Sequence, residues 1–279
     1  MSEPLRAAFV GRASEVGHAV AAAPVEGLLA SFIEHRAGNA PARVLAHVAE
    51  HAPQVVVVFG VDTLPAATVH AIGVPVVAWA VAPDRPPGLE HHPDLPQANP
   101  EFVAARAAAV DYARVIDRPL PVADELFTAS PRSPGGPRAL VIGHSSVRNE
   151  LLLIDSKHRH EVLHIAGGLK GAALAAALAA CDTAINVRDD EKPDFGPRVG
   201  LYLAAGLLLV SEPLHPPHGL VANRDHIEIR TSADLVDVLA RVGADPAAFS
   251  AVREAGRRRA EAFRASRVYP ELLAPLVTT

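Results

Sequence analysis

Residues 54–59 read QVVVVF, an unbroken run of β-branched and aromatic residues after Gln54. Such a run is typical of a strand that is buried on both faces, as in a parallel sheet. Residues 74–80, VPVVAWA, repeat the pattern, and residues 64–71 between them have the apolar spacing of a short helix. A strand, a helix and a strand in this order predict an α/β domain in which helices cover both faces of a parallel sheet.

The same alternation extends through the first half of the chain. We predict further strands at 5–10 and 112–116, and helices at 25–36, 41–51 and 101–109. Only about four strands result, against the roughly five to six of an ordinary sheet. The N-terminal sheet is therefore predicted to be reduced, with a ligand-binding side that is either open or completed by another subunit in a homo-oligomer.

Residues 129–137, ASPRSPGGP, form the clearest linker in the chain, and the strand–helix pattern restarts after it. We therefore predict two doubly wound, Rossmann-like α/β domains, an N-terminal one over 1–128 and a C-terminal one over 138–279. The last helix is free to pack back on the N-terminal domain. In the second domain strands are predicted at 138–142, 161–165, 183–187, 207–211 and 226–229, and helices at 146–154, 169–180, 197–205, 232–242, 247–265 and 269–276.

The composition excludes several classes of protein. Of the 279 residues, 49% are apolar and 20% are charged, which excludes intrinsic disorder. No apolar run reaches the roughly 18–20 residues of a membrane span, and the N-terminus lacks the pattern of a signal peptide. A single cysteine, Cys181, excludes an internal disulfide, and the net charge of −5 does not favour an overall nucleic-acid binder. We expect a cytoplasmic protein without a cofactor.

The first candidate site lies where the strand–helix pattern restarts after the linker. A strand ends at Gly143, and His144, Ser145, Ser146 and Arg148 follow it into a helix. Glycine lets a ligand approach the backbone, a serine can cap the helix, and the helix N-terminus together with the arginine attracts an anion. This turn is predicted to bind a phosphate, although a glycine with a serine cap also ends many ordinary strand–helix turns.

The stretch 186–206, NVRDDEKPDFGPRVGLYLAAG, carries the second candidate site. It passes from a strand end through Asp194, Phe195 and Gly196 into a helix whose first turn holds Arg198. An arginine there opposes the helix dipole, so it favours a bound anion. The acidic residues 189–191 are better explained as a solvated loop. Gly168, with Gly167 before it, either admits a flat ligand such as a nucleobase or makes a tight turn.

In the first half, His18 is the best candidate for a general base, because histidine titrates near neutral pH. A surface histidine is the alternative. Asp62 and Asp84 follow the two buried strands, at the sheet edge where ligands bind, and either could hold an acceptor hydroxyl. Asp62 could equally cap the helix that follows it.

Three other groups of residues are better explained by structural roles than by catalysis or ligand binding. His158, His160 and His164 lack a carboxylate or cysteine at metal-ligand spacing, so no metal site is predicted. The segment 215–218, HPPH, is read as a rigid loop. The arginines at 253, 257, 258, 259 and 264 are interleaved with glutamates at helical spacing, which favours a solvated face over a patch for an acidic partner. The sequence also lacks a G-x-S-x-G, P-loop or G-x-G-x-x-G motif.

The second half resembles the C-terminal domain of group 1 glycosyltransferases, in the branch related to the spore-maturation protein CgeB. The segments ALVIGHSSVRNELL, VLHIAGGLKGAALAAALAACDTAINV and FGPRVGLYLAAGLLLVSEPLHPPHGL carry the resemblance. In the first half, APQVVVVFGVDTLPAATVHAIGVPVVAWAVAPD is similar to the acceptor-side domain of that branch. About two thirds of the chain is covered, by an order of segments rather than by a strict motif.

The resemblance implies a GT-B architecture, in which two Rossmann-like domains face a cleft that holds a nucleotide-sugar. It implies that Gly143, Ser145, Ser146 and Arg148 face the donor diphosphate and that Gly168 lies near the base. Residues 194–198 would lie near the sugar and its phosphates. The family often carries a spaced pair of glutamates at positions that are here Leu201 and near Pro193, so this chain departs from the usual contacts to the sugar and ribose hydroxyls.

The resemblance, together with the candidate residues, implies a metal-independent glycosyltransferase of the hexosyltransferase type. It would move a sugar from a nucleotide-sugar to the hydroxyl of an acceptor: a small molecule, a glycan, a protein or a modified nucleic acid. Two alternatives stay open, a non-catalytic nucleotide- or sugar-binding protein and a nucleotide-sugar epimerase, because fold alone does not choose between them.

Overall fold

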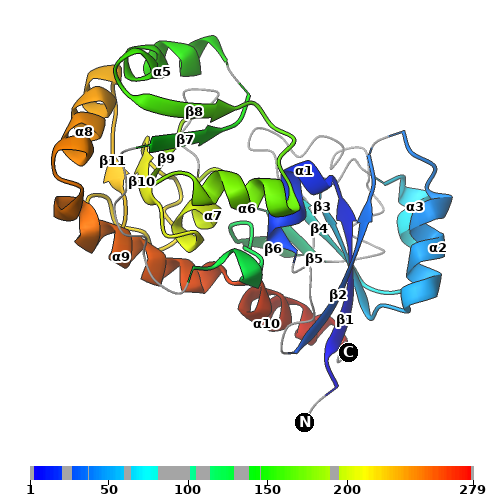
Figure 1. The fold of residues 1–279 in the computed structure, drawn as a ribbon. Coiled ribbons are helices and arrows are strands. Elements are labelled where there is room, and N and C mark those ends of the chain that lie inside the picture. The colour runs from blue at the N-terminus through cyan, green and yellow to red at the C-terminus, as the bar shows by residue number, and fades with distance from the viewer. Residues whose placement is uncertain are drawn as a thin grey trace. The chain divides into compact units, whose positions relative to one another are not determined.

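The computed structural model describes residues 3–20, 27–36, 38–59, 64–80, 101–104, 114–128, 138–144, 146–188 and 195–277. The chain forms two compact units (Figure 1). Unit 1 comprises Met1–Glu125 together with Arg264–Thr279, and unit 2 comprises Leu126–Phe263. Each unit is built on one parallel sheet, which confirms the predicted doubly wound α/β class.

The sheet of unit 1 has the strand order β2-β1-β3-β4-β5-β6. Its strands are β1 (Leu5–Gly11), β2 (Leu28–Glu34), β3 (Val55–Phe59), β4 (Val76–Ala80), β5 (Glu101–Ala104) and β6 (Arg114–Asp117). The helical elements are α1 (Ala13–Val16), η1 (Gly17–Ala19), α2 (Ala42–His51), α3 (Ala66–Ala71), η4 (Asp124–Leu126) and α10 (Ala265–Val277), of which η4 ends at the first residue of unit 2.

The last helix of the chain completes the core of unit 1. Tyr269 of α10 packs against Phe9 and Trp79 of the sheet, at ring-centroid distances of 4.6 and 5.9 Å. Its hydroxyl donates a hydrogen bond to the carbonyl oxygen of Ala19 at 2.9 Å. Val44 of α2 and Val69 of α3 belong to a separate apolar cluster, which contains the other face of the strands.

Two sequence predictions in unit 1 are wrong. Residues 28–34 form strand β2 and not a helix, because they pair in parallel with all seven residues of β1. Leu28 and Phe32 belong to one apolar cluster and Ile33 to the other, which is the alternation of a strand. Leu28, Leu29, Phe32 and Ile33 also fit a helical stripe, so spacing alone could not decide.

The second error concerns residues 101–109, which we predicted to be a helix. Residues 101–104 form β5, which pairs with both β4 and β6; the rest of that segment lies outside the described residues. With β2 and β5 the sheet of unit 1 has six strands, so the predicted reduction to about four is also wrong. In both cases pairing with neighbouring strands overrode a short-range pattern.

Unit 2 follows the predicted elements closely. Its sheet has the order β11-β10-β9-β7-β8, with β7 (Arg138–Ile142), β8 (Glu161–Ile165), β9 (Thr183–Asn186), β10 (Leu208–Ser211) and β11 (Ile227–Glu228). The helical elements are α5 (Val147–Arg159), α6 (Gly171–Ala179), α7 (Val199–Ala204), α8 (Ser232–Ala244), η5 (Pro246–Phe249), α9 (Ser250–Ala260) and η6 (Glu261–Phe263). Leu153 of α5 and Leu235 of α8 share one apolar cluster with the strands, so these two helices cover the same face.

Candidate functional site

Strand order in unit 2 selects one edge of the sheet for a ligand. After β7 the chain moves outward to β8, and it then returns past β7 to form β9 on the other side. Adjacent strands whose connections leave in opposite directions create a crevice at their carboxyl ends, where doubly wound sheets bind ligands. In unit 2 this switch point lies between β7 and β9, next to the predicted phosphate turn at Gly143.

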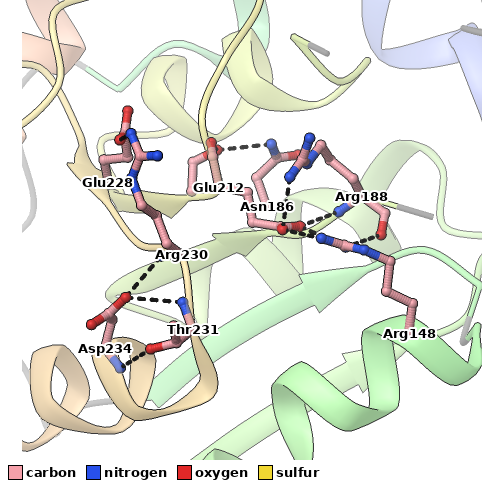
Figure 2. A network of polar contacts seen from close by, with 9 residues as sticks. Arg148, Asn186, Arg188, Glu212, Glu228, Arg230, Thr231 and Asp234 are labelled. Atoms are coloured by element: carbon pink, nitrogen blue, oxygen red, sulfur yellow. Dashed lines mark hydrogen bonds and ion pairs between the residues drawn. The ribbon is translucent and has the colours of Figure 1, made fainter. Parts of the chain in front are cut away.

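A cluster of two arginines and one glutamate spans the switch point (Figure 2). Arg148 comes from the first turn of α5, Arg188 follows β9, and Glu212 follows β10. Nη1 of Arg148 lies 3.0 Å from Oε2 of Glu212 and 2.8 Å from the carbonyl oxygen of Arg188, and its Nη2 pairs with Oε1 of Glu212. Arg188 donates to Glu212 from its backbone N–H at 2.8 Å and from Nη2 at 3.1 Å.

The Glu212 carboxylate is buried, with a side-chain exposure of 2%, whereas the Arg148 side chain is 31% exposed. Burial acts to raise the pKa of Glu212, but the hydrogen bonds from Arg148 and Arg188 outweigh it and lower that pKa below its usual value. The carboxylate is therefore ionised at neutral pH. Two guanidinium charges against one carboxylate leave this cluster, which we call the arginine cluster, with a net charge of +1.

The ends of β9 and β10 are joined by further polar contacts. Nδ2 of Asn186 donates to Oγ of Ser211 at 3.0 Å, and Ser211 donates to the carbonyl oxygen of Glu212 at 2.7 Å. A Cβ atom on Gly196 would lie 2.7 Å from Oδ1 of Asn186, and the φ of Gly196 is +74°. The positive φ favours glycine at 196, and a larger residue there would also have to displace the Asn186 amide. Phe195, just before it, is buried against His218 and Phe263.

Arg198 and Tyr202 bring the second candidate stretch to the end of β7. The backbone N–H of Ile142 donates to the Tyr202 hydroxyl at 3.2 Å, and Nη1 of Arg198 donates to the Ile142 carbonyl oxygen at 3.4 Å. Burial raises the pKa of Tyr202 to about 12, so its hydroxyl stays protonated. Gly143 is the next residue along the chain, so the structure brings Arg198 and the predicted phosphate turn together.

The turns after β7 and β8 leave open space. A Cβ atom on Gly143 or Gly168 would meet no heavy atom of the described residues within 4 Å, and both residues have a positive φ. Ser146 caps α5 by accepting the backbone N–H of Asn149 at 3.1 Å, which confirms its predicted capping role. His144 is exposed beside it, and Ser145 lies outside the described residues.

A second set of polar contacts reaches the Gly143 turn from α5 and β8. Lys157 of α5 lies 2.8 Å from both carboxylate oxygens of Glu150 and 2.9 Å from Nδ1 of His164 on β8. Nε2 of His164 lies 3.0 Å from the Gly143 carbonyl oxygen. His164 therefore links Lys157 and Glu150 of α5 to the carbonyl oxygen of Gly143. His164 thus contributes to the turn rather than to a metal site.

Of the predicted residues in unit 1, only His18 can be placed. It lies in η1 after β1, with an exposure of 6%, and its carbonyl oxygen accepts the backbone N–H of Ala123 at 2.7 Å. It is therefore buried and not a surface histidine. Asp62 and Asp84 lie outside the described residues, as does Asp194 in unit 2.

Sequence reasoning missed Glu212 and Arg188 as site residues. The available signal was positional, because both follow short buried strands, at the edge where ligands bind. Within the described ranges, no three His, Cys, Asp or Glu side chains gather in a way that could hold a metal ion. None of the described helices has the length and apolar character that a membrane crossing requires.

Comparison with solved structures identifies the fold. The chain is similar to sucrose-phosphate synthase from Thermosynechococcus elongatus, with a TM-score of 0.63 and 11% identity over 98% of this chain and 99% of that one. It is also similar to HepE from Anabaena in complex with UDP-glucose, with a TM-score of 0.61, 10% identity and coverage of 99% and 100%. The two units form the GT-B fold.

A third similar structure is a putative UDP-N-acetylglucosamine 2-epimerase from Listeria monocytogenes, with a TM-score of 0.56, 10% identity and coverage of 99% and 98%. No family model matches the sequence, and no curated protein matches it. At this level of identity the likeness concerns the fold, on which both sugar transfer and epimerisation occur.

Proposed function

We propose that this protein is a glycosyltransferase of the CgeB-like branch of group 1, which moves a sugar from a nucleotide-sugar to an acceptor hydroxyl without a metal. The observation that carries the proposal is the arginine cluster at the switch point of unit 2. A net positive group at the carboxyl ends of parallel strands is suited to an anionic ligand. The similar structures in complex with UDP and UDP-glucose support a nucleoside diphosphate as the anionic part of the ligand.

In this proposal the donor diphosphate binds at the turn after β7. Gly143, His144, Ser145 and Ser146 would provide the turn, while Arg148 and Arg198 would provide the charge. Arg188 and Glu212 would hold Arg148 in place, since both contact its guanidinium group. Gly168 would lie by the base, and residues 194–196 by the sugar.

The chemistry would be electrostatic. The acceptor hydroxyl attacks the anomeric carbon, the bond between that carbon and the donor phosphate oxygen breaks, and the nucleoside diphosphate leaves with the additional negative charge. Arginine side chains placed where this charge develops would stabilise the transition state. The proton of the acceptor would pass to a base of unit 1, for which we propose His18, with Asp62 and Asp84 as the other candidates.

A specific observation favours a second candidate function, a binding protein without turnover. Leu201, at the position of a family glutamate, is 1% exposed and belongs to the fully buried helix α7. A buried leucine cannot bond a ribose or sugar hydroxyl, so donor binding could persist while catalysis is lost. The epimerase remains a third alternative, supported by the likeness of the fold alone.

A panel of nucleotide-sugars tested by thermal shift, followed by product analysis of each hit, separates these functions. A transferase hydrolyses its donor slowly when no acceptor is present and releases nucleoside diphosphate. A binding protein shows the thermal shift without any product, and an epimerase returns a changed sugar still attached to its nucleotide. Absence of a shift with every nucleotide-sugar would contradict the proposal.

A further inference from the structure

Unit 2 contains a hollow that lies away from the arginine cluster. It has a volume of about 660 Å³ and lies between α9 and the segment that precedes β11. Ala251, Val252 and Ala255 of α9 give it an apolar lining. The volume falls within the roughly 300–1,000 Å³ of sites for small molecules. Because the segment before β11 leads into the amino end of that strand, this hollow is separate from the site at the carboxyl ends.

The charged lining of the hollow is unbalanced. Arg224, Arg258 and Arg259 line it, against a single carboxylate from Asp225. These four residues carry three positive charges and one negative charge, a net of +2. Glu254, which lies 3.7 Å from Arg258, is exposed on α9 and is not among the lining residues. Counting Glu254 as well would reduce the net charge to +1, so the arginines remain in excess.

Asp225 fixes two of the arginines and is itself fully occupied. Its carboxylate accepts Nε and Nη2 of Arg224 at 3.1 and 2.9 Å and the backbone N–H of Val221 at 2.9 Å, and it lies 3.7 Å from Nε of Arg259. Burial acts to raise the pKa of Asp225, but the bonds from Arg224 and Val221 outweigh it and lower that pKa. The ionised carboxylate therefore anchors guanidinium groups that keep further N–H donors, since each carries five.

Close packing builds the hollow into the fold. A Cβ atom on Gly256 of α9 would lie 2.4 Å from the carbonyl oxygen of Asp225 and 2.8 Å from Cδ2 of Leu203. Only glycine allows α9 to approach the Asp225 segment so closely. Backbone packing thus brings the arginines of α9 and Arg224 to one hollow.

We propose that this hollow is a second anion site, which binds a small molecule that carries a phosphate group. Guanidinium groups suit a phosphate because their planar donors can bond two of its oxygens at once. The apolar lining would receive the uncharged part of the ligand. Arg258 and Arg259, two members of the arginine run predicted to form a solvated face, then have a role that does not depend on sugar transfer. The prediction of a solvated face is wrong for Arg253, which is buried.

The test is a titration of the full chain with inorganic phosphate at constant ionic strength, in which NMR monitors the chemical shifts of the backbone amides. Saturable shifts are expected for residues 223–225 and 251–259. The double variant Arg258→Ala/Arg259→Ala should weaken phosphate binding by about tenfold or more, the effect of losing one charge-assisted hydrogen bond. Arg36→Ala is the matched control, because Arg36 is an exposed arginine of unit 1 whose side chain is 60% exposed.

A further variant, Ala255→Glu, retains every arginine but places a carboxylate in the hollow. It should abolish the phosphate shifts while the melting temperature stays close to that of the unaltered protein. Shifts that rise linearly without saturation, or that persist in both variants, would overturn the proposal. So would saturation by a polyglutamate peptide but not by phosphate, which would indicate an acidic protein partner. Amides 146–149 report separately on the site after β7.

Discussion

The two sheets share one topology but differ in the chemistry at their switch points. In unit 1 the switch point lies between β1 and β3, and a Cβ atom on Gly11 at the end of β1 would lie 3.0 Å from Cγ2 of Val16 and 3.1 Å from Cβ of Phe59. In unit 2 a Cβ atom on the equivalent Gly143 would meet no heavy atom of the described residues within 4 Å, and the arginine cluster lies beside it.

The difference shows that strand order determines where a ligand can bind, but not which ligand binds there. The turn of unit 1 is filled by apolar side chains and the turn of unit 2 is open and cationic. A doubly wound sheet only brings these turns to one edge, and the side chains decide what binds there. The comparison therefore favours unit 2 for the proposed anion binding, and under the proposed function unit 1 would contribute the base.

The largest effect is expected at His18 of unit 1. Under the proposed function, His18→Ala should lower the rate of sugar transfer by about 10²–10⁴-fold, the contribution of a positioned general base. Donor affinity should stay nearly unchanged, because the donor would bind to unit 2. Steady-state kinetics with a donor identified in the screen gives both values.

His18 is 6% exposed, so its removal can also disturb the core of unit 1. Thermal unfolding of His18→Ala and His18→Gln separates the two effects, since a structural role lowers stability without a specific loss of rate. A transfer rate within about threefold of the unaltered protein, far less than a general base contributes, would reject His18. The search would then move to Asp62 and Asp84.

The next largest effect is expected for the buried carboxylate of unit 2. Glu212→Ala should lower the free energy of unfolding by about 2–4 kcal/mol, because it leaves Arg148 and Arg188 without their shared partner. This is below the range for a fully buried pair, since the Arg148 side chain is 31% exposed. Denaturant unfolding measures the change.

Glu228→Ala is the matched control, because Glu228 pairs with Arg230, whose side chain is 73% exposed. A pair of this kind is expected to contribute about 0–1 kcal/mol. Equal losses in the two variants would show that the arginine cluster is no more than a surface contact.

The contribution of the Glu212 carboxylate to the free energy of unfolding should depend on pH. The pKa of Glu212 is lowered in the folded protein, so its contribution is fully present above the pKa of the unfolded chain. It is lost as the pH falls through the lower, folded value. The difference in unfolding free energy between the unaltered protein and Glu212→Gln should therefore be largest at neutral pH and shrink below the ordinary pKa of glutamate. A difference that grows on acidification would contradict this.

Most elements of this fold could be predicted, because unbroken apolar runs such as residues 55–59 fix strands locally. Residues 28–34 and 101–104 could not, because their strand character comes from pairing with neighbours. The site shows the same limit. Gly143 and Arg198 were predicted from their positions at turns, and the structure brings them close together. Glu212 was missed, since its role depends on Arg148, which is 64 residues distant in the sequence.

A smaller effect is expected at the arginine that reaches across the switch point. Under the proposed function, Arg148→Ala should weaken binding of a nucleoside diphosphate by about 1.5–3 kcal/mol, the range for a charge-assisted hydrogen bond. Arg148→Lys should recover only part of the loss, because an ammonium group lacks the planar pair of donors. Calorimetry with UDP measures both, and Arg230→Ala serves as a control for net charge. Unchanged affinity in Arg148→Ala would remove the arginine from the proposed donor site.

The smallest effect is expected at the helix cap beside the open turn. Ser146 caps α5 and Thr231 caps α8, each by accepting one backbone N–H at 3.1 Å. Ser146→Ala and Thr231→Ala should each lower the free energy of unfolding by about 1 kcal/mol, the usual cost of a lost cap. Only Ser146→Ala should also weaken diphosphate binding, since Ser146 alone lies at the open turn of unit 2. Equal diphosphate affinities in the two variants would restrict Ser146 to its structural role, and the donor would then depend on the backbone and the arginines.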